Sequence, residues 1–350
     1  MNKKSILEKN ARIVITGGTG LIGSYIIRYL LKEGFTNLLG IKRPDSPLQL
    51  FSKSERAKVE WIDADIKDIV GLEPAIETAE YVFHCAGLVS FSPKAKKELI
   101  AVNQIGTANI VNLCLEHGVK KLVYTSSTSA IGRPPKNNTI RESNKWEGNS
   151  HLSQYAISKY LGEMEVWRGN AEGLETVILN PSTVLGGGFW HTGPQKLFNL
   201  SWKSFKYYPS GTTGLVDVRD VAKLHIQAMQ SAINGQRYII CGENVSYQSL
   251  MEQIAAGLNT AAPSKKIKKW MQQLIWRIEA IKSVFSKQPP FLTQETVAIT
   301  NQNYLYENRK SKEAFGFSYT PIEQTIREMT ELFKQAKKDK APFSRMELRK

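Results

Sequence analysis

Short runs of β-branched and aromatic residues alternate with longer amphipathic segments in the first half of the chain, and this alternation constrains the fold most. The runs are RIVIT, NLLGIKR, KVEWI, YVFHCAG, KLVYTSS and TVILNPS. Strands that alternate with helices favour a parallel sheet, because each helix carries the chain back to the edge where the next strand begins. We therefore predict an α/β fold with a doubly wound parallel sheet that is covered by helices on both faces.

The character of the sequence changes after Val184, where Gly, Pro and aromatic residues dominate GGGFWHTGPQ and YYPSGTTG. LVDVRDVAKLHIQAMQ and RYIICG then have the patterns of a helix and a strand, so we expect the chain to return to the sheet. We predict a sheet domain over residues 1–185 and 215–243, and a smaller C-terminal substrate lobe over 186–214 and 244–333. Residues 334–350 are predicted to be a flexible basic tail.

The net charge of +15 comes mostly from two segments and does not predict a nucleic-acid partner. Seven basic residues oppose one acidic residue in Lys265–Lys287, which gives +6. Seven basic residues oppose two acidic residues in Lys334–Lys350, which gives +5. Neither segment carries a nucleic-acid recognition motif, so we expect no nucleic acid to bind.

Several features favour a cytoplasmic protein without a metal. The opening MNKKSILEKNAR is followed by IVIT, which is too short for the apolar core of a secretory signal. No apolar run approaches the ~20 residues that a transmembrane helix needs. Cys85, Cys114 and Cys241 are scattered and odd in number, which is typical of reduced thiols. Cys85 has neither the spacing nor the histidine partner of a metal ligand.

Residues 270–285 have the pattern of a basic amphipathic helix. Its apolar stripe consists of Trp270, Leu274, Ile278, Ile281 and Phe285. We favour a helix that packs this stripe on the core of the lobe. The alternative is weak contact with an anionic membrane surface, since lysines flank the stripe.

TGGTGLIG follows the first predicted strand directly and opens a helix. Gly17, Gly20 and Gly23 permit a tight turn, close approach of a pyrophosphate to backbone N–H groups, and close packing of the helix on the sheet. Because the strand, the turn and the helix occur in the required order, the motif predicts a dinucleotide site in a Rossmann-like sheet.

The residues about 20 positions after the glycines bear on the choice between NADP and NAD. An Asp or Glu there would accept the ribose hydroxyls of NAD, but this chain has Lys42 and Arg43. Cations favour a 2′-phosphate, so we expect NADP in preference to NAD, unless both cations are solvated at a loop edge. Asp65 in DADI is either an acceptor for the adenine amino group or a turn residue.

SQYAISK places Tyr155 and Lys159 four positions apart in a segment that reads as a helix. Residues at i and i+4 lie on one helical face, so the phenol and the ammonium are able to meet in one small volume. This spacing permits catalysis but is common by chance, and its meaning depends on the other motifs.

The chain carries TGGTGLIG, DADI, HCAG, VNQIGTAN, YTSS, YAISK, NPSTVLG and VDVRDVA in this order. With these motifs it resembles the extended short-chain dehydrogenase/reductases, which belong to the NAD-dependent epimerase/dehydratase superfamily. The resemblance extends from about Arg12 to Gly242 and more loosely to about residue 330. NPSTVLG and the cationic KRP resemble the dihydroflavonol-4-reductase-like branch.

The resemblance implies a catalytic set of Ser127, Tyr155 and Lys159. Tyr155 would donate a proton to a substrate carbonyl as hydride arrives, or remove a proton from an alcohol in the reverse reaction. Lys159 would lower the pKa of the phenol and hold the nicotinamide ribose, which the chemistry requires because a free tyrosine is a poor base at neutral pH. Ser127, five residues before Gly132, would hydrogen-bond the reacting oxygen, and Ser126 is the adjacent alternative.

The resemblance also implies further cofactor contacts. The backbone of Leu21 and Ile22 would meet the pyrophosphate, and Asp65 and Ile66 would frame the adenine. The residues after the fourth strand would line the cofactor with small side chains, Asn103 would fix the local geometry or lie exposed on its helix, and the NPSTV segment would pass near the nicotinamide amide. The residues of these last groups are Cys85, Ala86, Gly87, Asn103, Pro181, Ser182, Thr183 and Val184.

We expect an oxidoreductase that transfers hydride to or from a ketone or secondary alcohol. One alternative is a nucleotide-sugar epimerase with tightly bound NAD, which would use the same residues; Asn180 suits both activities. Another is a nucleotide-sensing protein without turnover. A sugar dehydratase is disfavoured, because TSSTSAIG lacks the Asp-Glu pair beside the serine that the resemblance requires for elimination.

The sequence does not identify the small-molecule substrate. Trp190, Phe198, Tyr207 and Tyr208 offer aromatic walls for a pocket or belong to the core of the lobe. By resemblance, we expect a homodimer through the helices that contain residues 103–115 and 155–167.

Overall fold

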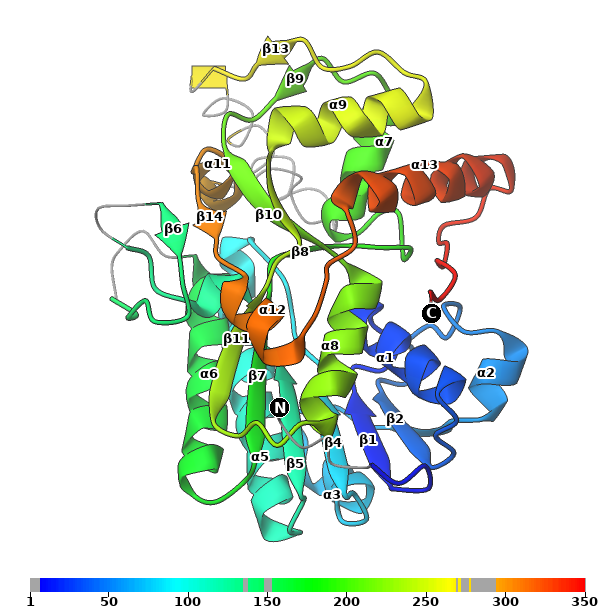
Figure 1. Ribbon diagram of the computed structural model, residues 1–350, viewed down its shortest axis with the longest axis vertical. Helices are drawn as coiled ribbons and strands as arrows, with labels where there is room; N and C mark the ends of the chain where they lie inside the picture. The colour runs from blue at the N-terminus through cyan, green and yellow to red at the C-terminus, as the bar shows by residue number, and fades with distance from the viewer. Residues whose placement is uncertain are drawn as a thin grey trace.

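A seven-stranded parallel sheet, flanked by helices, forms the lower part of the molecule in Figure 1. The computed structural model describes residues 7–134, 138–147, 153–268, 270–271, 277 and 294–349. The order across the sheet is β11-β7-β5-β4-β1-β2-β3, so the predicted doubly wound parallel sheet is confirmed. The strands are β1 Ile13–Thr16, β2 Leu38–Lys42, β3 Glu60–Asp63, β4 Tyr81–His84, β5 Lys121–Thr125, β7 Thr176–Pro181 and β11 Gln236–Ile240.

Alternate residues of each strand face two separate apolar layers. Ile13 and Ile15 of β1 join the core under α1 and α8, whereas Val14 joins the core under α3, α5 and α6. This alternation buries both faces of the sheet, which explains why its strands read as continuous apolar runs. The helices are α1 Leu21–Lys32, α3 Ile69–Ile76, α5 Gly106–Glu116, α6 Gln154–Ala171 and α8 Val218–Gln230.

The strand order reverses direction at β1, which lies between β2 and β4. In an open parallel sheet, the loops at such a point leave a crevice at the carboxyl ends of the strands. The segments that follow β1, β4, β5 and β7 therefore meet at one edge of the sheet. The predicted motifs TGGTGLIG, HCAG, YTSS and NPSTVLG all fall on these segments.

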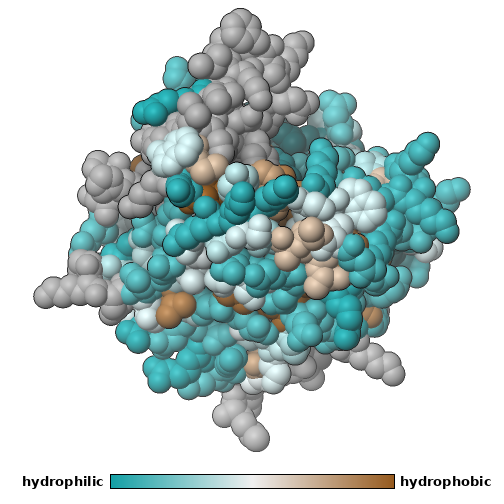
Figure 2. Space-filling view, turned by 90° about the horizontal axis from the view of Figure 1, so that it is seen from above, coloured by the Kyte–Doolittle hydropathy of each residue, from teal (hydrophilic) through white to brown (hydrophobic). Residues whose placement is uncertain are grey.

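The smaller lobe lies over this edge and has its own sheet, in the order β12-β10-β8 (Figure 1). Its aromatic core packs Trp190 against Phe198 and Phe333, with ring centroids 5.5 and 5.0 Å apart. On the face seen from above, the coloured residues are mostly hydrophilic, with small apolar patches (Figure 2). The elements are β8 Thr183–Leu185, β10 Thr212–Asp217, β12 Glu243–Ser246, α7 Lys196–Trp202, α9 Tyr247–Leu258 and α13 Ile322–Lys338.

Short elements connect the two parts. Two-stranded pairs form between β9 and β13 and between β6 and β14. The short strands are β6 Thr139–Ile140, β9 Tyr207–Tyr208, β13 Lys265–Lys266 and β14 Leu305–Tyr306. The short helices are α2 Lys53–Ala57, α4 Lys96–Ile100, α11 Gln294–Thr300, α12 Arg309–Phe315, the π-helical turn η2 Ala101–Ile105, and the 3₁₀ turns η1 Pro93–Ala95, η3 Thr128–Ala130 and η4 Gly193–Gln195.

The C-terminal segment differs from the prediction of a flexible basic tail. The helix α13 continues to Lys338, and residues 339–349 then return to α1. Met346 is buried; its N–H donates to the Tyr25 hydroxyl at 2.8 Å, and its carbonyl accepts from Arg28 Nη2 at 3.1 Å. The prediction was wrong because it rested on the basic residues, whereas the apolar Phe343 and Met346 fix the segment.

Most of the predicted amphipathic helix at 270–285 lies outside the described residues. Trp270, at its start, is exposed. Among the residues that the structure describes, no helix is long and apolar enough to cross a membrane.

We expect Met346→Ala to lower the free energy of unfolding by about 2 to 4 kcal/mol, because truncating a buried methionine removes its apolar contacts and leaves a cavity. Denaturant unfolding measures this change. Lys338→Ala, at an exposed position in the last turn of α13, is the control and should change the value by less than about 0.5 kcal/mol. Equal effects of the two substitutions would contradict a fixed C-terminal segment.

Candidate active site

The loop after β1 is shaped so that a phosphate group is able to approach the backbone. Gly17 has a φ of +64°, and a Cβ built on it would lie 2.6 Å from the backbone nitrogen of Ala86. A Cβ on Gly23 would lie 2.4 Å from the Gly17 carbonyl oxygen. Gly20 precedes α1 without a side-chain cap, and the first turn, which contains Leu21 and Ile22, has no acidic residue. Free N–H groups at the positive end of a helix fit a pyrophosphate.

Two cations follow β2, and the structure gives them different surroundings. Lys42 forms an ion pair with Asp63 at the end of β3. Arg43 is exposed, and the part of the chain that the structure describes gives it no ion pair. Of the two residues predicted to read a 2′-phosphate, Arg43 is therefore the one with an uncommitted charge.

The DADI segment lies beside β3 and forms a turn. The Oδ1 of Asp65 accepts a hydrogen bond from the Lys67 N–H at 3.0 Å, which is the turn role that the sequence left open. Ile66 is buried, and its carbonyl accepts from Asn109 Nδ2 at 3.0 Å. The apolar side chain of Ile66 and the half-buried carboxylate of Asp65 thus have fixed places near the adenine end of the expected site.

The small residues after β4 are tied to both neighbouring segments. The Ala86 N–H donates to Thr16 Oγ1 at 3.2 Å. Desolvation raises the pKa of the Cys85 thiol to about 12, which leaves it protonated and unreactive. Gly87 is exposed, and a Cβ on it would lie 3.2 Å from Asn103 Oδ1.

Asn103 is buried in η2. The alternative from the sequence, an asparagine exposed on its helix, is therefore wrong. Its amide accepts from the Leu88 N–H at 2.8 Å and donates to the Leu88 carbonyl at 2.9 Å and to Ser158 Oγ at 2.9 Å. Asn103 therefore ties the segment after β4 to the helix that bears Tyr155 and Lys159.

Tyr155 and Lys159 lie in the first two turns of α6, which begins after the capping residue Ser153. Lys159 is buried; its Nζ donates to the Tyr124 hydroxyl at 2.8 Å and to the Thr125 carbonyl at 2.9 Å. Burial lowers the pKa of Lys159. The Tyr155 ring meets Phe91 edge-on, with centroids 5.6 Å apart.

The structure gives the two candidate serines different roles. Ser126 is buried, and its hydroxyl donates to Glu163 Oε2 at 2.8 Å. Ser127 caps η3, where its Oγ accepts from the Ser129 N–H at 3.1 Å. Among the residues that the structure describes, the hydroxyl proton of Ser127 has no assigned acceptor, whereas that of Ser126 is donated to Glu163.

The segment after β7 closes the site toward the lobe. Pro181 ends β7, and the Ser182 N–H donates to the Ile240 carbonyl at 2.9 Å. Thr183 Oγ1 lies 3.0 Å from Thr213 Oγ1, and Val184 packs on the apolar cluster that extends from the layer under α1 and α8 into the lobe. This segment therefore links the sheet edge to the lobe.

Sequence reasoning missed a buried chain of polar groups behind Lys159. His84 Nε2 lies 3.0 Å from Thr107 Oγ1, and His84 Nδ1 lies 2.6 Å from Thr16 Oγ1. Burial lowers the pKa of His84 to about 3, so the ring is neutral. The Thr107 hydroxyl donates to the Asn103 carbonyl at 2.7 Å, and the Tyr124 hydroxyl, which accepts from Lys159, interacts with the same threonine. HCAG and YTSS contain His84 and Tyr124, but nothing in the sequence links them.

Glu163, Arg237 and Asn180 form a second missed group. Glu163 is fully buried on α6, one turn beyond Lys159, and pairs with Arg237 Nη1 at 2.9 Å. Asn180 Nδ2 donates to Glu163 Oε2 at 2.8 Å. The i+4 spacing from Lys159 to Glu163 was the only signal available in the sequence.

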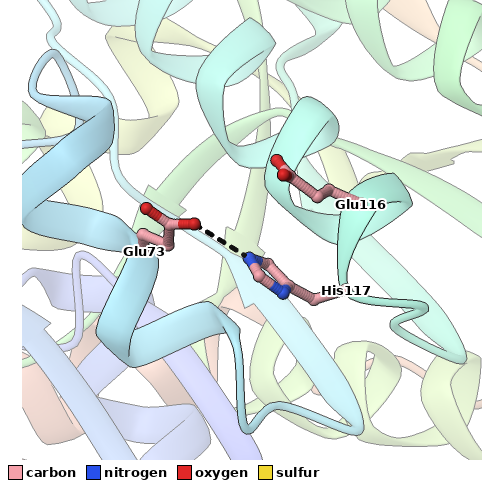
Figure 3. Close-up of side chains that lie close together, drawn as sticks. All are labelled: Glu73, Glu116 and His117. Carbon is pink, nitrogen blue, oxygen red and sulfur yellow. Dashed lines mark ion pairs between the residues drawn. The ribbon is translucent and has the colours of Figure 1, made fainter.

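A cluster of two carboxylates and a histidine lies on the surface, formed by Glu73, Glu116 and His117 (Figure 3). His117 Nε2 lies 3.6 Å from Glu73 Oε1. The cluster is at the C-terminal end of α5, which runs antiparallel to the strands, so it faces away from the edge that carries the site. Both carboxylates are exposed, and we assign no metal to them.

Three comparisons with known proteins agree with this arrangement. Residues 13–241 match the family described as the NAD dependent epimerase/dehydratase family. Cinnamoyl-CoA reductase 1 of Arabidopsis thaliana is 30% identical over 259 residues, which cover 70% of this chain and 74% of that protein. A Synechocystis protein named provisionally as a dihydroflavonol 4-reductase is 26% identical over 328 residues, which cover 91% of this chain and 93% of that protein.

A solved structure has a similar fold. The UDP-glucose 4-epimerase of Thermus thermophilus, in complex with NAD, superimposes with a TM-score of 0.73 at 22% identity. The match covers 93% of this chain and 99% of that one.

We expect Gly17→Ala to abolish measurable binding of NADH and NADPH, because the new methyl group would clash with the backbone at Ala86. Fluorescence titration of the reduced dinucleotides checks this. Gly118→Ala is the matched control: Gly118 also has a φ of +64°, but a Cβ there meets nothing within 4 Å. It should lower stability by about 1 kcal/mol and leave binding intact. Loss of binding in both variants would indicate backbone strain instead.

Proposed function

Because the chain belongs to the NAD dependent epimerase/dehydratase family, we propose that it is a reductase that prefers NADP and transfers hydride between the nicotinamide and a ketone or secondary alcohol. The observation that carries the proposal is the buried ammonium of Lys159, which lies one helical turn from Tyr155 and beside the loop of Ser127. A bound nicotinamide would give or take the hydride.

The geometry of Lys159 supports a role in proton transfer. Two of its N–H groups are used by Tyr124 and the Thr125 carbonyl, so the third is left for the ribose of the cofactor. Its positive charge would stabilise the negative charge that develops on the Tyr155 oxygen as the proton leaves. In a site with little water, this stabilisation is stronger than at the surface.

Ser127 would orient the substrate. Its hydroxyl accepts from Ser129 and is free to donate to the same substrate oxygen that receives the proton of Tyr155. Two donors on one oxygen favour the form with negative charge, which is the form that develops during hydride transfer.

An epimerase with retained NAD is the second candidate. Ser344 N–H donates to the Gly188 carbonyl at 3.0 Å, and a Cβ on Gly188 would lie 3.1 Å from Leu21 Cδ1 at the start of α1. A C-terminal segment that braces this loop over the phosphate site would slow the release of a cofactor. A sensing protein without turnover is less supported, because the sequence retains Tyr155, Lys159 and Ser127.

We further propose a cytoplasmic homodimer that acts on a small molecule. The helices α5 and α6 pack side by side, and Ile105 at the start of this pair is a half-exposed apolar side chain that a second copy would cover. Weak contact with a membrane through 270–285 remains a proposal, supported by the exposed Trp270. Sedimentation velocity tests the dimer, and co-sedimentation with anionic vesicles tests the membrane contact.

The deciding experiment is to denature the purified protein and identify any nicotinamide that is released, then to titrate the native protein with NADPH and NADH. Protein without cofactor that prefers NADPH supports the reductase. Stoichiometric NAD that survives purification rejects the reductase in favour of the epimerase.

We expect Arg43→Ala to weaken NADPH binding about tenfold to a hundredfold, because one charge-assisted hydrogen bond to the 2′-phosphate is lost. NADH binding should not change. Lys42→Ala is the matched control and should have a smaller effect, since Asp63 already pairs with that lysine. Isothermal titration with both dinucleotides measures the four changes, and equal loss of NADH and NADPH affinity in Arg43→Ala would argue against phosphate reading.

We expect Tyr155→Phe to lower kcat about 10²- to 10⁴-fold, with the NADPH dissociation constant changed by no more than about threefold, because only the proton donor is removed. The measurement uses the best substrate from a panel of ketones and aldehydes. Tyr160→Phe is the control, since that ring stacks on Trp146 with centroids 4.3 Å apart. A Tyr155→Phe enzyme with undiminished kcat would exclude Tyr155 as the acid.

A further inference from the structure

Glu163 is a fully buried carboxylate that the proposed reaction does not use directly. It lies on α6, four residues after Lys159, on the same face of the helix. A buried charge is costly unless it is paired and hydrogen-bonded. The surroundings of Glu163 therefore indicate what it holds in place.

Within the described part of the chain, the hydrogen bonds of this carboxylate come from four different places in the fold. Oε2 accepts from Ser126 Oγ and from Asn180 Nδ2, both at 2.8 Å. Oε1 accepts from Arg237 Nη1 at 2.9 Å and from Trp167 Nε1 at 3.4 Å. The donors come from the ends of β5 and β7, from β11 and from α6, so Glu163 joins three strands of the sheet to the helix.

These contacts also determine where Ser127 lies. Asn180 Nδ2, which donates to Glu163, donates to the Ser127 carbonyl at 3.0 Å as well. Glu163 thus holds the side chain of Ser126 directly and the backbone of Ser127 through Asn180. A shift of this loop relative to α6 would leave buried polar groups without partners, which costs about 1 to 3 kcal/mol for each group.

Glu163 is also the anion closest along the helix to the ammonium of Lys159. The other titratable groups that face Lys159 or its partners are Tyr155 on α6, His84 and Cys85 at the end of β4, Tyr124 on β5, and His225 on α8 behind Thr125. Burial lowers the pKa of His84 to about 3 and that of His225 to about 4. Burial raises the pKa of Cys85 to about 12 and also raises that of Tyr124. These four groups are neutral at ordinary pH.

Arg237 balances the charge of Glu163. Its other guanidinium nitrogens donate to backbone carbonyls, from Nε to Glu142 at 3.0 Å and from Nη2 to Asn144 at 3.1 Å. The ion pair therefore holds one anion and one cation in fixed positions. The anion stabilises the protonated form of Lys159, and the cation destabilises it.

We propose that Glu163, paired with Arg237, is a positioning residue that holds the Ser127 loop against α6 and supplies the counter-charge for Lys159. The role of Glu163 in catalysis rests on the proposed function. Its effect on the charge of Lys159 does not, and it can be measured without any enzymatic reaction. The two halves of the pair should shift the titration of Lys159 in opposite directions.

The test follows the ε-ammonium signal of Lys159 by ¹⁵N NMR of lysine-labelled protein as the pH is raised, with the signal assigned by its absence in Lys159→Arg. Glu163→Gln removes the anion and should lower the titration midpoint by about one pH unit, whereas Arg237→Gln removes the cation and should raise it by a smaller amount, since Arg237 contacts Glu163 rather than Lys159. The double variant should have a midpoint between those of the two single variants. Glu165→Gln is the control, because Glu165 lies on the same helix at the surface and pairs with Arg168.

Shifts in the same direction, or no shift in either single variant, would overturn the proposal, since loosened packing alone does not produce opposite signs. Circular dichroism checks that each variant folds. If Glu163→Gln does not fold, the proposal is tested by Arg237→Gln alone. A titration midpoint of Lys159 that falls or does not change in Arg237→Gln then rejects the proposal. Titration of the same proteins with NADPH and NADH separates the two claims. Wild-type protein that binds neither dinucleotide refutes the proposed function, while the opposite shifts of Lys159 would still establish the role of Glu163.

Discussion

The helix α6 lies against its neighbours at a distance that only glycine permits, and the whole site depends on this contact. A Cβ on Gly162 would lie 2.1 Å from the Asn103 carbonyl oxygen, and one on Gly169 would lie 2.5 Å from Val111 Cγ1. The helix therefore has one possible depth on the layer formed by η2 and α5. Since α6 carries Tyr155, Lys159 and Glu163, the same contact sets the height of the proton donor, its ammonium and the buried carboxylate above the sheet.

The parallel sheet supplies the other half of the arrangement. Its strands are buried on both faces, so the loops at their carboxyl ends have little freedom and bring together residues that are far apart in the chain. The phosphate loop after β1 and the small residues after β4 are joined by the Thr16 hydroxyl, and the serine loop after β5 is tied to β7 by Asn180. A rigid scaffold of this kind allows weak individual hydrogen bonds to hold a site to within fractions of an ångström.

The parts of the fold and site that could be predicted from the sequence are those with local signals. The turn at Gly17 is predicted by a glycine motif directly after a strand pattern. The pair of Tyr155 and Lys159 is predicted by their spacing of four residues in a helix. Each of these patterns lies within a few residues of the sequence. The pair of Glu163 and Arg237 spans 74 residues and joins a helix to an edge strand, so no local pattern reports it. The neutralisation of Lys42 by Asp63 was hidden for the same reason, because it depends on the register of β2 and β3. The prediction of a flexible tail was wrong because the basic residues of this segment outnumber the two apolar side chains, Phe343 and Met346, that pack it against the rest of the protein.

The return of the C-terminal segment to α1 has a consequence for the order in which the fold closes. The Tyr25 hydroxyl accepts from the Met346 N–H, and these two residues are 321 positions apart in the sequence. A contact of such long range forms late in folding, because the intervening chain has to be ordered before the contact can be made at low entropic cost. The face of α1 that packs on α8 can therefore be covered before the face that receives residues 339–349.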